Sequence, residues 1–342
     1  MHYAVFVEKD MIKENNFKIL SLSGGGYRGL YTAKVLEILE EELKQENLND
    51  CLANYFDLIT GTSIGGIIAL ALAYEISAKE IVEIFIEKGE NIFKKQSCIS
   101  FFTAKYNSKN LKQILYEWFK EHKIGDLKHP IAIPSIDYTT GYPVVFKTAH
   151  HPNFKRDWKL KIVDVALATS AAPTYFKRHI IDKSEYIDGG IFANSPSLIG
   201  LHEAEIFFSQ ELKNIKILSI GTLSGKKTIN PKSNKNGGLL DWGEGNIIKV
   251  ARNILDVTLS TQQLFMQQLV KHRIQENLVV IDENLTQSSA PFVGLDTVTS
   301  ESKQILISNA NQSAKIALGK NEVKSFFESK VNTPHFYNVS HE

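Results

Sequence analysis

The chain has 342 residues, of which 43% are hydrophobic and 23% are charged, an ordinary composition for a globular protein with a large core. Its formal net charge of +1 offers no bulk attraction to a polyanion, so we expect no DNA or RNA polymer as a partner. The two cysteines, Cys51 and Cys98, provide neither a disulfide framework nor metal-ligand spacing, which agrees with a reducing cytoplasm.

The N-terminal segment 1–10 has no secretory signal pattern, because its apolar run is short and acidic residues follow. The longest apolar run, residues 64–74, has 11 residues. A membrane-spanning helix needs about 20. We therefore expect a cytoplasmic protein whose contact with a membrane is peripheral.

The first predicted unit is a strand, a glycine-rich loop and a helix. Residues 17–23 alternate in polarity and are rich in β-forming residues, while residues 31–43 carry apolar side chains at helical spacing. A loop in this position directs backbone N–H groups to one spot at the positive end of a helix dipole. In an acyl hydrolase that spot binds the oxyanion of the tetrahedral intermediate. The loop reads Gly24-Gly25-Gly26-Tyr27-Arg28-Gly29.

The same loop also fits a dinucleotide-binding pattern, with Gly24, Gly26 and Gly29 at the required spacing. That pattern needs an acidic residue at the end of a second strand, about 20 residues later. Glu46 and Asp50 lie instead in a polar segment with no strand before it. The dinucleotide interpretation is therefore disfavoured.

The second predicted unit combines a short buried strand at 55–60, a turn, and a buried helix at 64–73. The turn reads Gly61-Thr62-Ser63-Ile64-Gly65, and a strand, a sharp turn and a helix form a nucleophile elbow. Gly61 and Gly65 leave room for the strand and the helix to pass close to the strained serine. A serine hydroxyl still needs a base that accepts its proton before it becomes an effective nucleophile.

Strands and helices alternate through the rest of the first two-thirds, which predicts an α/β layered sheet. Residues 131–136 and 144–147 flank a polar turn and predict a strand pair, and 215–220 predicts a late strand. Helices are expected at 77–93, 108–120, 162–170 and 196–210.

A third motif, Asp188-Gly189-Gly190, follows a β-rich stretch and places a carboxylate on a turn. An Asp-Gly turn is common by itself. Combined with a serine elbow and an oxyanion loop, it makes Asp188 a candidate general base.

A Ser-Asp-His triad would need a histidine after Asp188. The histidines after Asp188 are His202, His272, His335 and His341. None of them follows a predicted strand beside a glycine, so a Ser-Asp dyad is favoured. His150 and His151 precede a proline and are expected in a solvated turn.

At these motifs the chain resembles the patatin-like phospholipase family. The family's G-G-G-x-R/K-G loop is matched by residues 24–29, its G-x-S-x-G elbow by 61–65 and its D-G-G/A motif by 188–190. A weaker family block, A-S-x-A-x-P, is echoed by residues 168–173. The resemblance covers roughly residues 17–223, and none of the three main motifs departs from the pattern.

The resemblance implies a three-layer α/β/α sandwich with a central, mostly parallel sheet, and a Ser–Asp dyad without metal or cofactor. Ser63 is then the nucleophile and Asp188 the base. Arg28 is expected to hold the glycine loop rather than to steer a phosphate. The oxyanion hole is assigned to the loop residues Gly24, Gly25, Gly26, Arg28 and Gly29, with backbone N–H groups near Gly25 and Gly26 as its donors. The motifs are supported by Gly61, Gly65, Gly189 and Gly190.

We expect a catalytic core at 17–223 and a C-terminal helical extension at 224–342 that packs on it. The extension could serve as a lid, or it could contact an activator or a second copy of the chain. Within the extension, 246–270 and 302–316 predict helices and 278–281 predicts a strand. Two lysine-containing segments are candidates for lipid contact, 97–105 and 225–238. A core-anchored loop and a solvated loop, respectively, are the alternatives.

A narrower resemblance rests on residues 21–33 and on the length of the chain. Both resemble the phospholipase effectors of bacterial antiphage systems that signal with cyclic oligonucleotides. This implies a lipase of the inner membrane that a cyclic dinucleotide switches on. We assign no residue to the nucleotide, and the lysine-rich segment 225–238 is the place to look for a contact with its phosphate. The sequence thus predicts a phospholipase A-type serine acyl hydrolase at the inner membrane surface. A constitutive lipid or ester hydrolase and an inactive binding protein stay open as alternatives.

Overall fold

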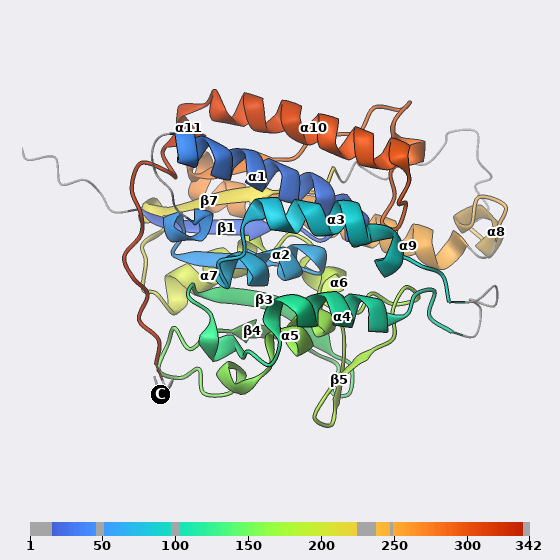
Figure 1. Cartoon of the computed structure of the whole chain (residues 1–342), viewed down its shortest axis with the longest axis horizontal. Coiled ribbons are helices and arrows are strands. Elements are labelled where there is room, and N and C mark those ends of the chain that lie inside the picture. The colour runs from blue at the N-terminus through green and yellow to red at the C-terminus, as the bar shows by residue number, and fades with distance from the viewer. Residues whose placement is uncertain (1–15, 46–50, 97–102, 224–236, 247–248, 338–342) are drawn as a thin grey trace, which may run out of the picture.

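The computed structural model describes residues 16–45, 51–96, 103–223, 237–246 and 249–337 (Figure 1). Their centre is a mixed eight-stranded sheet with the strand order β5-β6-β3-β2-β1-β7-β8, in which β4 also pairs with β3. The run β3-β2-β1-β7-β8 is parallel, while β4 and β6 are antiparallel to β3. The strands are β1 Phe17–Leu22, β2 Leu58–Gly61, β3 Ile131–Asp137, β4 Tyr142–Lys147, β5 His179–Ile181, β6 Ser184–Asp188, β7 Ile215–Ile220 and β8 Leu278–Ile281.

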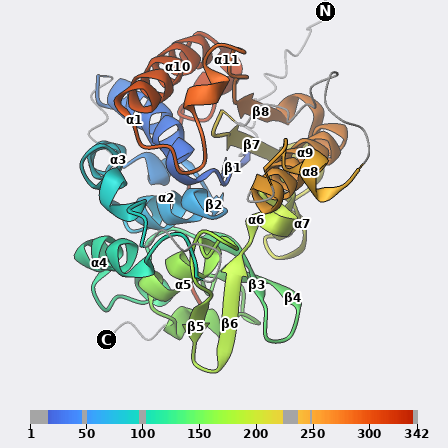
Figure 2. The ribbon, with the colours of Figure 1, turned by 90° about the vertical axis from the view of Figure 1, so that its right-hand side faces the viewer.

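Helices cover both faces of the sheet and make three layers (Figure 2). One layer contains α1, α2, α3 and α10, and the other contains α7 and α9. The helices are α1 Gly29–Gln45, α2 Ile64–Ala73, α3 Ala78–Ile92, α4 Ser108–Phe119, α5 Ile162–Thr169, α6 Gly190–Ala193, α7 Ser197–Ile206, α8 Leu239–Trp242, α9 Val250–Ile274, α10 Ser300–Leu318 and α11 Asn321–Lys324. None of these described helices is both long and apolar enough to cross a membrane.

The central strands are buried on both faces, and β1 shows how one strand serves two cores. Leu20 and Leu22 belong to the large core with α1 and α2, whereas Phe17 and Ile19 belong to a smaller core with α7 and α9. Successive side chains of a strand point to opposite faces, so an apolar run supplies both cores. The layered α/β architecture with a mostly parallel sheet, expected from the sequence, is confirmed.

Residues after position 237 belong to the same layers. β8 extends the sheet beside β7, α10 packs on α1, and α9 packs on α6 and α7. The C-terminal third therefore lies against both the sheet and the segment that follows the Asp-Gly-Gly motif.

Most predicted elements are found within a few residues of their expected bounds. The strand expected at 55–60 is shorter: Leu52–Tyr55 forms a 3₁₀ turn and β2 begins at Leu58. Tyr55 is buried and its ring lies 5.7 Å from that of Phe327. Its apolar character therefore reflects packing against the C-terminal segment rather than pairing in the sheet.

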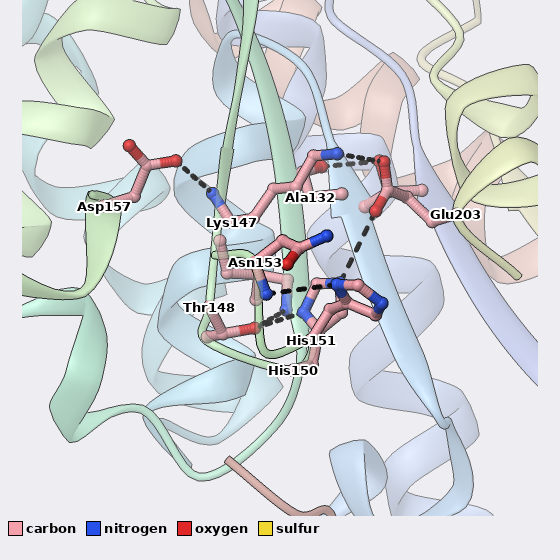
Figure 3. A network of polar contacts seen from close by, with 10 residues as sticks. Ala132, Lys147, Thr148, His150, His151, Asn153, Asp157 and Glu203 are labelled. Carbon is pink, nitrogen blue, oxygen red and sulfur yellow. Dashed lines mark hydrogen bonds and ion pairs between the residues drawn. The ribbon is translucent and has the colours of Figure 1, made fainter. Parts of the chain in front are cut away.

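The solvated turn expected at His150 is wrong, because this histidine is buried in a polar network (Figure 3). Its Nδ1 lies 2.8 Å from Thr148 Oγ1 and its Nε2 lies 3.5 Å from Glu203 Oε2. The Lys147 ammonium lies 2.5 Å from the other oxygen of Glu203. Burial lowers the pKa of His150, although Glu203 opposes the shift. Thr148 and Glu203 thus satisfy a histidine that sequence reasoning placed in water, and Lys147 pairs with Glu203.

Candidate active site

Ser63 lies at a sharp turn between β2 and α2, as the elbow pattern predicted. Its φ of 54° and ψ of −123° are strained for a residue with a side chain. A Cβ on Gly61 would lie 2.1 Å from the carbonyl oxygen of Gly65, and a Cβ on Gly65 would lie 2.3 Å from that of Leu22. Only glycine therefore allows β1, β2 and α2 to meet so closely at the serine.

Asp188 reaches Ser63 because β6 runs back along β3. β3 continues beyond the end of β2, and the register of β6 places Asp188 beside Ser135, at the level of the elbow. Ser63 Oγ donates a hydrogen bond of 2.5 Å to Asp188 Oδ2. The N–H of Gly190 donates to Asp188 Oδ1 at 2.7 Å. Two motifs that lie 125 residues apart thus form one hydrogen-bonded pair.

The environment of Asp188 suits a group that exchanges a proton. The residue is buried, and in the described part of the chain no cation forms an ion pair with it. Burial raises the pKa of Asp188 to about 6, although hydrogen bonds from Ser63 and Gly190 oppose the shift. A carboxylate with a pKa near neutrality can accept a proton from a serine hydroxyl and later return it.

The glycine loop lies beside the serine, and some of its N–H groups are already engaged. Those of Gly24, Arg28 and Gly29 donate to backbone carbonyl groups. Gly25 and Gly26 line the pocket with the serine, and no backbone acceptor for their N–H groups is found among the described residues. Among the described residues, the N–H groups left available in this loop are those of Gly25 and Gly26, near which the family resemblance places the oxyanion hole.

Side chains on several elements hold this loop in place. The Nε of Arg28 donates to the carbonyl oxygen of Gly25 at 3.4 Å, so Arg28 contacts the loop itself. Thr222 Oγ1 donates to the carbonyl oxygen of Gly24 at 3.1 Å, and the N–H of Gly24 donates to that of Asn194 at 2.9 Å. The loop is therefore connected both to the segment after β7 and to the segment after Asp188.

A narrow apolar pocket opens onto Ser63 and Asp188. Together with the open solvent at its mouth, it comprises about 780 Å³ of space that no atom fills. Apolar side chains dominate its lining, which suits an acyl chain whose ester is presented to the serine. They come from α2, α3, α4 and the C-terminal third, and include Ile67, Phe85, Leu111, Leu255, Leu259 and Leu295.

Sequence reasoning missed Thr169 at the end of α5. Its hydroxyl accepts a hydrogen bond of 3.1 Å from the Ser63 N–H and donates one of 2.7 Å to the carbonyl oxygen of Pro134. It therefore ties the elbow to β3. The signal for it was the weak family block at 168–173. Leu255, Leu259 and Leu295 had no comparable signal, because they lie in a part of the chain without a motif.

The structure agrees with a dyad rather than a triad. No histidine lines the pocket in the part of the chain that the structure describes, and Ser63 contacts Asp188 directly.

The two candidate segments for lipid contact are described only in part. Residues 97–102 and 224–236 lie outside the described residues, so the segments 97–105 and 225–238 can be placed only at their ends.

Comparisons with known proteins agree with the motifs. The family model described as patatin-like phospholipase matches residues 20–200. A cGAMP-activated phospholipase of Pseudomonas aeruginosa is 39% identical over 94% of this chain and 95% of its own. One of Vibrio cholerae is 38% identical over 92% of this chain and 95% of its own. Patatin-T5 of Solanum tuberosum is 27% identical over 91% of this chain and 87% of its own.

The family match includes the glycine loop, the elbow and the Asp-Gly-Gly motif, and the relatives extend the similarity into the C-terminal third. The sheet and its flanking helices are those of the patatin fold. The chain therefore belongs to the patatin-like phospholipase family and is a hydrolase.

Proposed function

We propose that this protein hydrolyses acyl esters of membrane glycerophospholipids, as a phospholipase of the A type, through Ser63 and Asp188. The observation that carries the proposal is the 2.5 Å hydrogen bond from Ser63 Oγ to Asp188 Oδ2 at the wall of an apolar pocket. The pocket holds the acyl chain and leaves its ester carbonyl next to the strained serine.

In the proposed reaction, Ser63 Oγ attacks the acyl carbonyl carbon while Asp188 takes the hydroxyl proton. The resulting oxyanion receives hydrogen bonds from the N–H groups of Gly25 and Gly26. As the intermediate collapses, Asp188 protonates the departing alcohol and the acyl group stays on Ser63. The same carboxylate then activates a water molecule, which releases the fatty acid. No step needs a metal ion or a cofactor, so we expect a chelator to leave the rate unchanged.

We further propose that a cyclic dinucleotide activates the enzyme in antiphage defence. The support is the similarity to two cGAMP-activated phospholipases at 39% and 38% identity, across nearly the whole of each chain. Control by a ligand makes physical sense, because an unregulated lipase would damage the membrane of its own cell.

We propose that the substrate is reached by peripheral contact with the inner membrane, by an otherwise cytoplasmic protein. α8 supports this, because Leu239, Leu240 and Trp242 are 60%, 65% and 45% exposed. The helix lies at the right of Figure 1, on the same side as the beginning of α9, which carries the pocket residue Leu255. Exposed leucine and tryptophan side chains favour the interfacial region of a bilayer.

Replacement of Leu239, Leu240 and Trp242 together by serine tests the membrane contact. We expect vesicle binding and fatty-acid release from vesicles to fall about tenfold or more, since most of the apolar area of α8 is lost. Hydrolysis of a monomeric short-chain ester should not change. The matched control is Ile316→Ser on α10, an exposed apolar residue on a different helix. Equal loss on vesicles and on monomers would contradict a role in membrane contact.

The function itself is tested by fatty-acid release from phospholipid vesicles. Wild type, Ser63→Ala and Asp188→Asn are each assayed with and without a panel of cyclic dinucleotides, and with and without a chelator. Release by wild type alone, and only with a nucleotide, is the expected result. Release without nucleotide would leave a constitutive lipid hydrolase, and no release from vesicles or soluble esters would leave an inactive binding protein.

A further inference from the structure

The segment around Leu295 contacts the glycine loop from the C-terminal third of the chain. The carbonyl oxygen of Leu295 accepts a hydrogen bond of 2.7 Å from the N–H of Tyr27, directly after Gly26. A Cβ on Gly26 would lie 2.1 Å from that same oxygen, and Gly26 has a φ of +57°. The side chain of Leu295 lines the pocket. One residue thus fixes the end of the oxyanion loop and forms part of the acyl-binding wall.

Asp296, the next residue, anchors this contact. Its carboxylate accepts hydrogen bonds from the Lys105 ammonium and, at 2.6 Å, from the Tyr106 hydroxyl. The side chain is only 5% exposed, so it is a desolvated group with two donors. Burial raises the pKa of Asp296, but the hydrogen bonds from Lys105 and Tyr106 outweigh it, and the pKa lies below its ordinary value. The carboxylate is therefore ionised over the whole physiological range of pH.

The two donors are themselves fixed to the pocket wall. The N–H groups of Lys105 and Tyr106 donate to the carbonyl oxygens of Thr174 and Tyr175. The Tyr106 ring meets that of Phe93 edge to face at 5.4 Å. Tyr175 and Phe93 both line the pocket. The anchor of Asp296 is therefore part of a rigid aromatic wall and not a solvated surface ion pair, which would contribute little.

These contacts form a continuous path from the aromatic wall to the oxyanion donors. Lys105 and Tyr106 fix Asp296, Leu295 is joined to it through the backbone, and the Leu295 carbonyl fixes Tyr27. A donor contributes to catalysis only when it is held at the position that the oxyanion will occupy. A displacement of about 1 Å can reduce a rate about a hundredfold.

We infer that Asp296 is a positioning residue for the oxyanion loop, acting through Leu295 and held by Lys105 and Tyr106. The inference rests on the proposed hydrolase chemistry. It assigns a catalytic consequence to the C-terminal third, which lies beyond the matched family region of residues 20–200.

The test compares Asp296→Ala, Lys105→Met and Lys105→Arg with wild type. A soluble short-chain ester, assayed with the cyclic dinucleotide that activates wild type in the vesicle experiment, gives kcat and KM. An ether analogue of the substrate lipid gives a Kd that does not depend on chemistry. We expect Asp296→Ala to lower kcat about tenfold to a hundredfold, while KM and the Kd change less than about twofold. Lys105→Met should show a smaller loss, and Lys105→Arg, which keeps the charge and the donor, should restore most of it.

Amide hydrogen exchange provides a readout that does not require activity. We expect faster exchange in the peptide that contains Tyr27 for Asp296→Ala, because the acceptor on Leu295 is no longer anchored. The matched control is Glu205→Gln, which removes the partner of Arg273 in an ion pair of 2.7 Å between α7 and α9. It should leave both exchange at Tyr27 and kcat unchanged.

Several results would overturn the inference. Asp296→Ala with wild-type kcat, or with wild-type exchange at Tyr27, would do so. An effect of Asp296→Ala on KM alone would also overturn the inference. So would a kcat of Lys105→Arg that is as low as that of Lys105→Met. If Asp296→Ala does not fold, the pair of Lys105 variants decides, since Lys105 is one-third exposed and tolerates change. If wild type proves inactive with every cyclic dinucleotide of the panel, the proposed function fails, and the exchange at Tyr27 still decides whether Asp296 positions the loop.

Discussion

Asp188 and Asp296 are both nearly inaccessible to solvent beside the same pocket, yet their surroundings differ in one respect. Asp188 has a serine hydroxyl and a glycine N–H as partners, and burial raises its pKa to about 6. Asp296 has an ammonium and a tyrosine hydroxyl, which together hold its pKa below the ordinary value despite burial. The presence of a cation distinguishes the two sites.

This difference indicates how two carboxylates, one in the pocket and one beside a residue of its wall, serve different purposes. Without a cation, a buried carboxylate gains and loses a proton near neutral pH, as a general base must. With a cation, the carboxylate remains charged and serves as a fixed anchor. Asp188 suits the transfer of the serine proton, and Asp296 suits the support of the oxyanion loop.

The largest expected effect comes from removing either member of the dyad. Ser63→Ala removes the nucleophile, and Asp188→Asn keeps the shape but cannot accept the proton. Each should lower kcat more than about a thousandfold, and the double variant should be no worse than either single variant. Hydrolysis of a soluble ester by folded protein measures this. A rate near wild type in either variant would remove the dyad from the account.

The pH dependence of hydrolysis should follow Asp188 and not Asp296. Because the base form of Asp188 is required and its pKa is about 6, kcat/KM should fall about tenfold for each unit below pH 6 and level off above it. Asp296 stays ionised over this range, since its pKa lies below the ordinary value. A profile that is flat from pH 7 to pH 5 would contradict the assignment of Asp188 as the base.

A smaller effect is expected at Thr169, which orients the elbow without contacting the reacting atoms. Thr169→Val removes the acceptor for the Ser63 N–H and the donor to Pro134. We expect kcat to fall about tenfold, with a loss of stability of about 1–2 kcal/mol. Thr169→Ser retains the hydroxyl and is the matched control. A loss in Thr169→Ser with none in Thr169→Val would show that the methyl group, and not the hydrogen bond, is what matters.

The smallest effect on activity is expected from the buried network at His150. Glu203→Gln removes the charge that pairs with Lys147 and accepts from His150. Loss of one partner of a buried ion pair should cost about 3 kcal/mol in the free energy of unfolding. Chemical denaturation measures that cost, and kcat of the folded protein should stay within about twofold of wild type. A large loss of kcat at unchanged stability would connect this network to the catalytic pocket.

Much of the fold and part of the site could be predicted from local sequence patterns. The strand, loop and helix around residues 24–29 and the elbow at Ser63 could be predicted, because each depends on glycines within a few positions of a strand end. The contact of Asp188 with Ser63 could not be worked out from spacing. It depends on β6 running antiparallel to a β3 that is longer than β2. The family resemblance supplied that pairing instead.

What sequence reasoning missed depends on contacts between distant segments. Leu295 acts through a backbone carbonyl, which any residue possesses, so no residue type could mark it. His150 was placed in water because its polar neighbour in space, Glu203, lies 53 residues away on α7. A histidine was therefore assigned to a solvated turn, although Glu203 contacts it in the interior.

The most direct test of the central claim is the rate at which a fluorophosphonate labels Ser63, measured from pH 5 to pH 8 in wild type and in Asp188→Asn. The account predicts rapid labelling of wild type that declines below pH 6, and labelling of Asp188→Asn that is slower by more than about a hundredfold at every pH. Labelling of Asp188→Asn at the wild-type rate would mean that the buried carboxylate does not activate the serine.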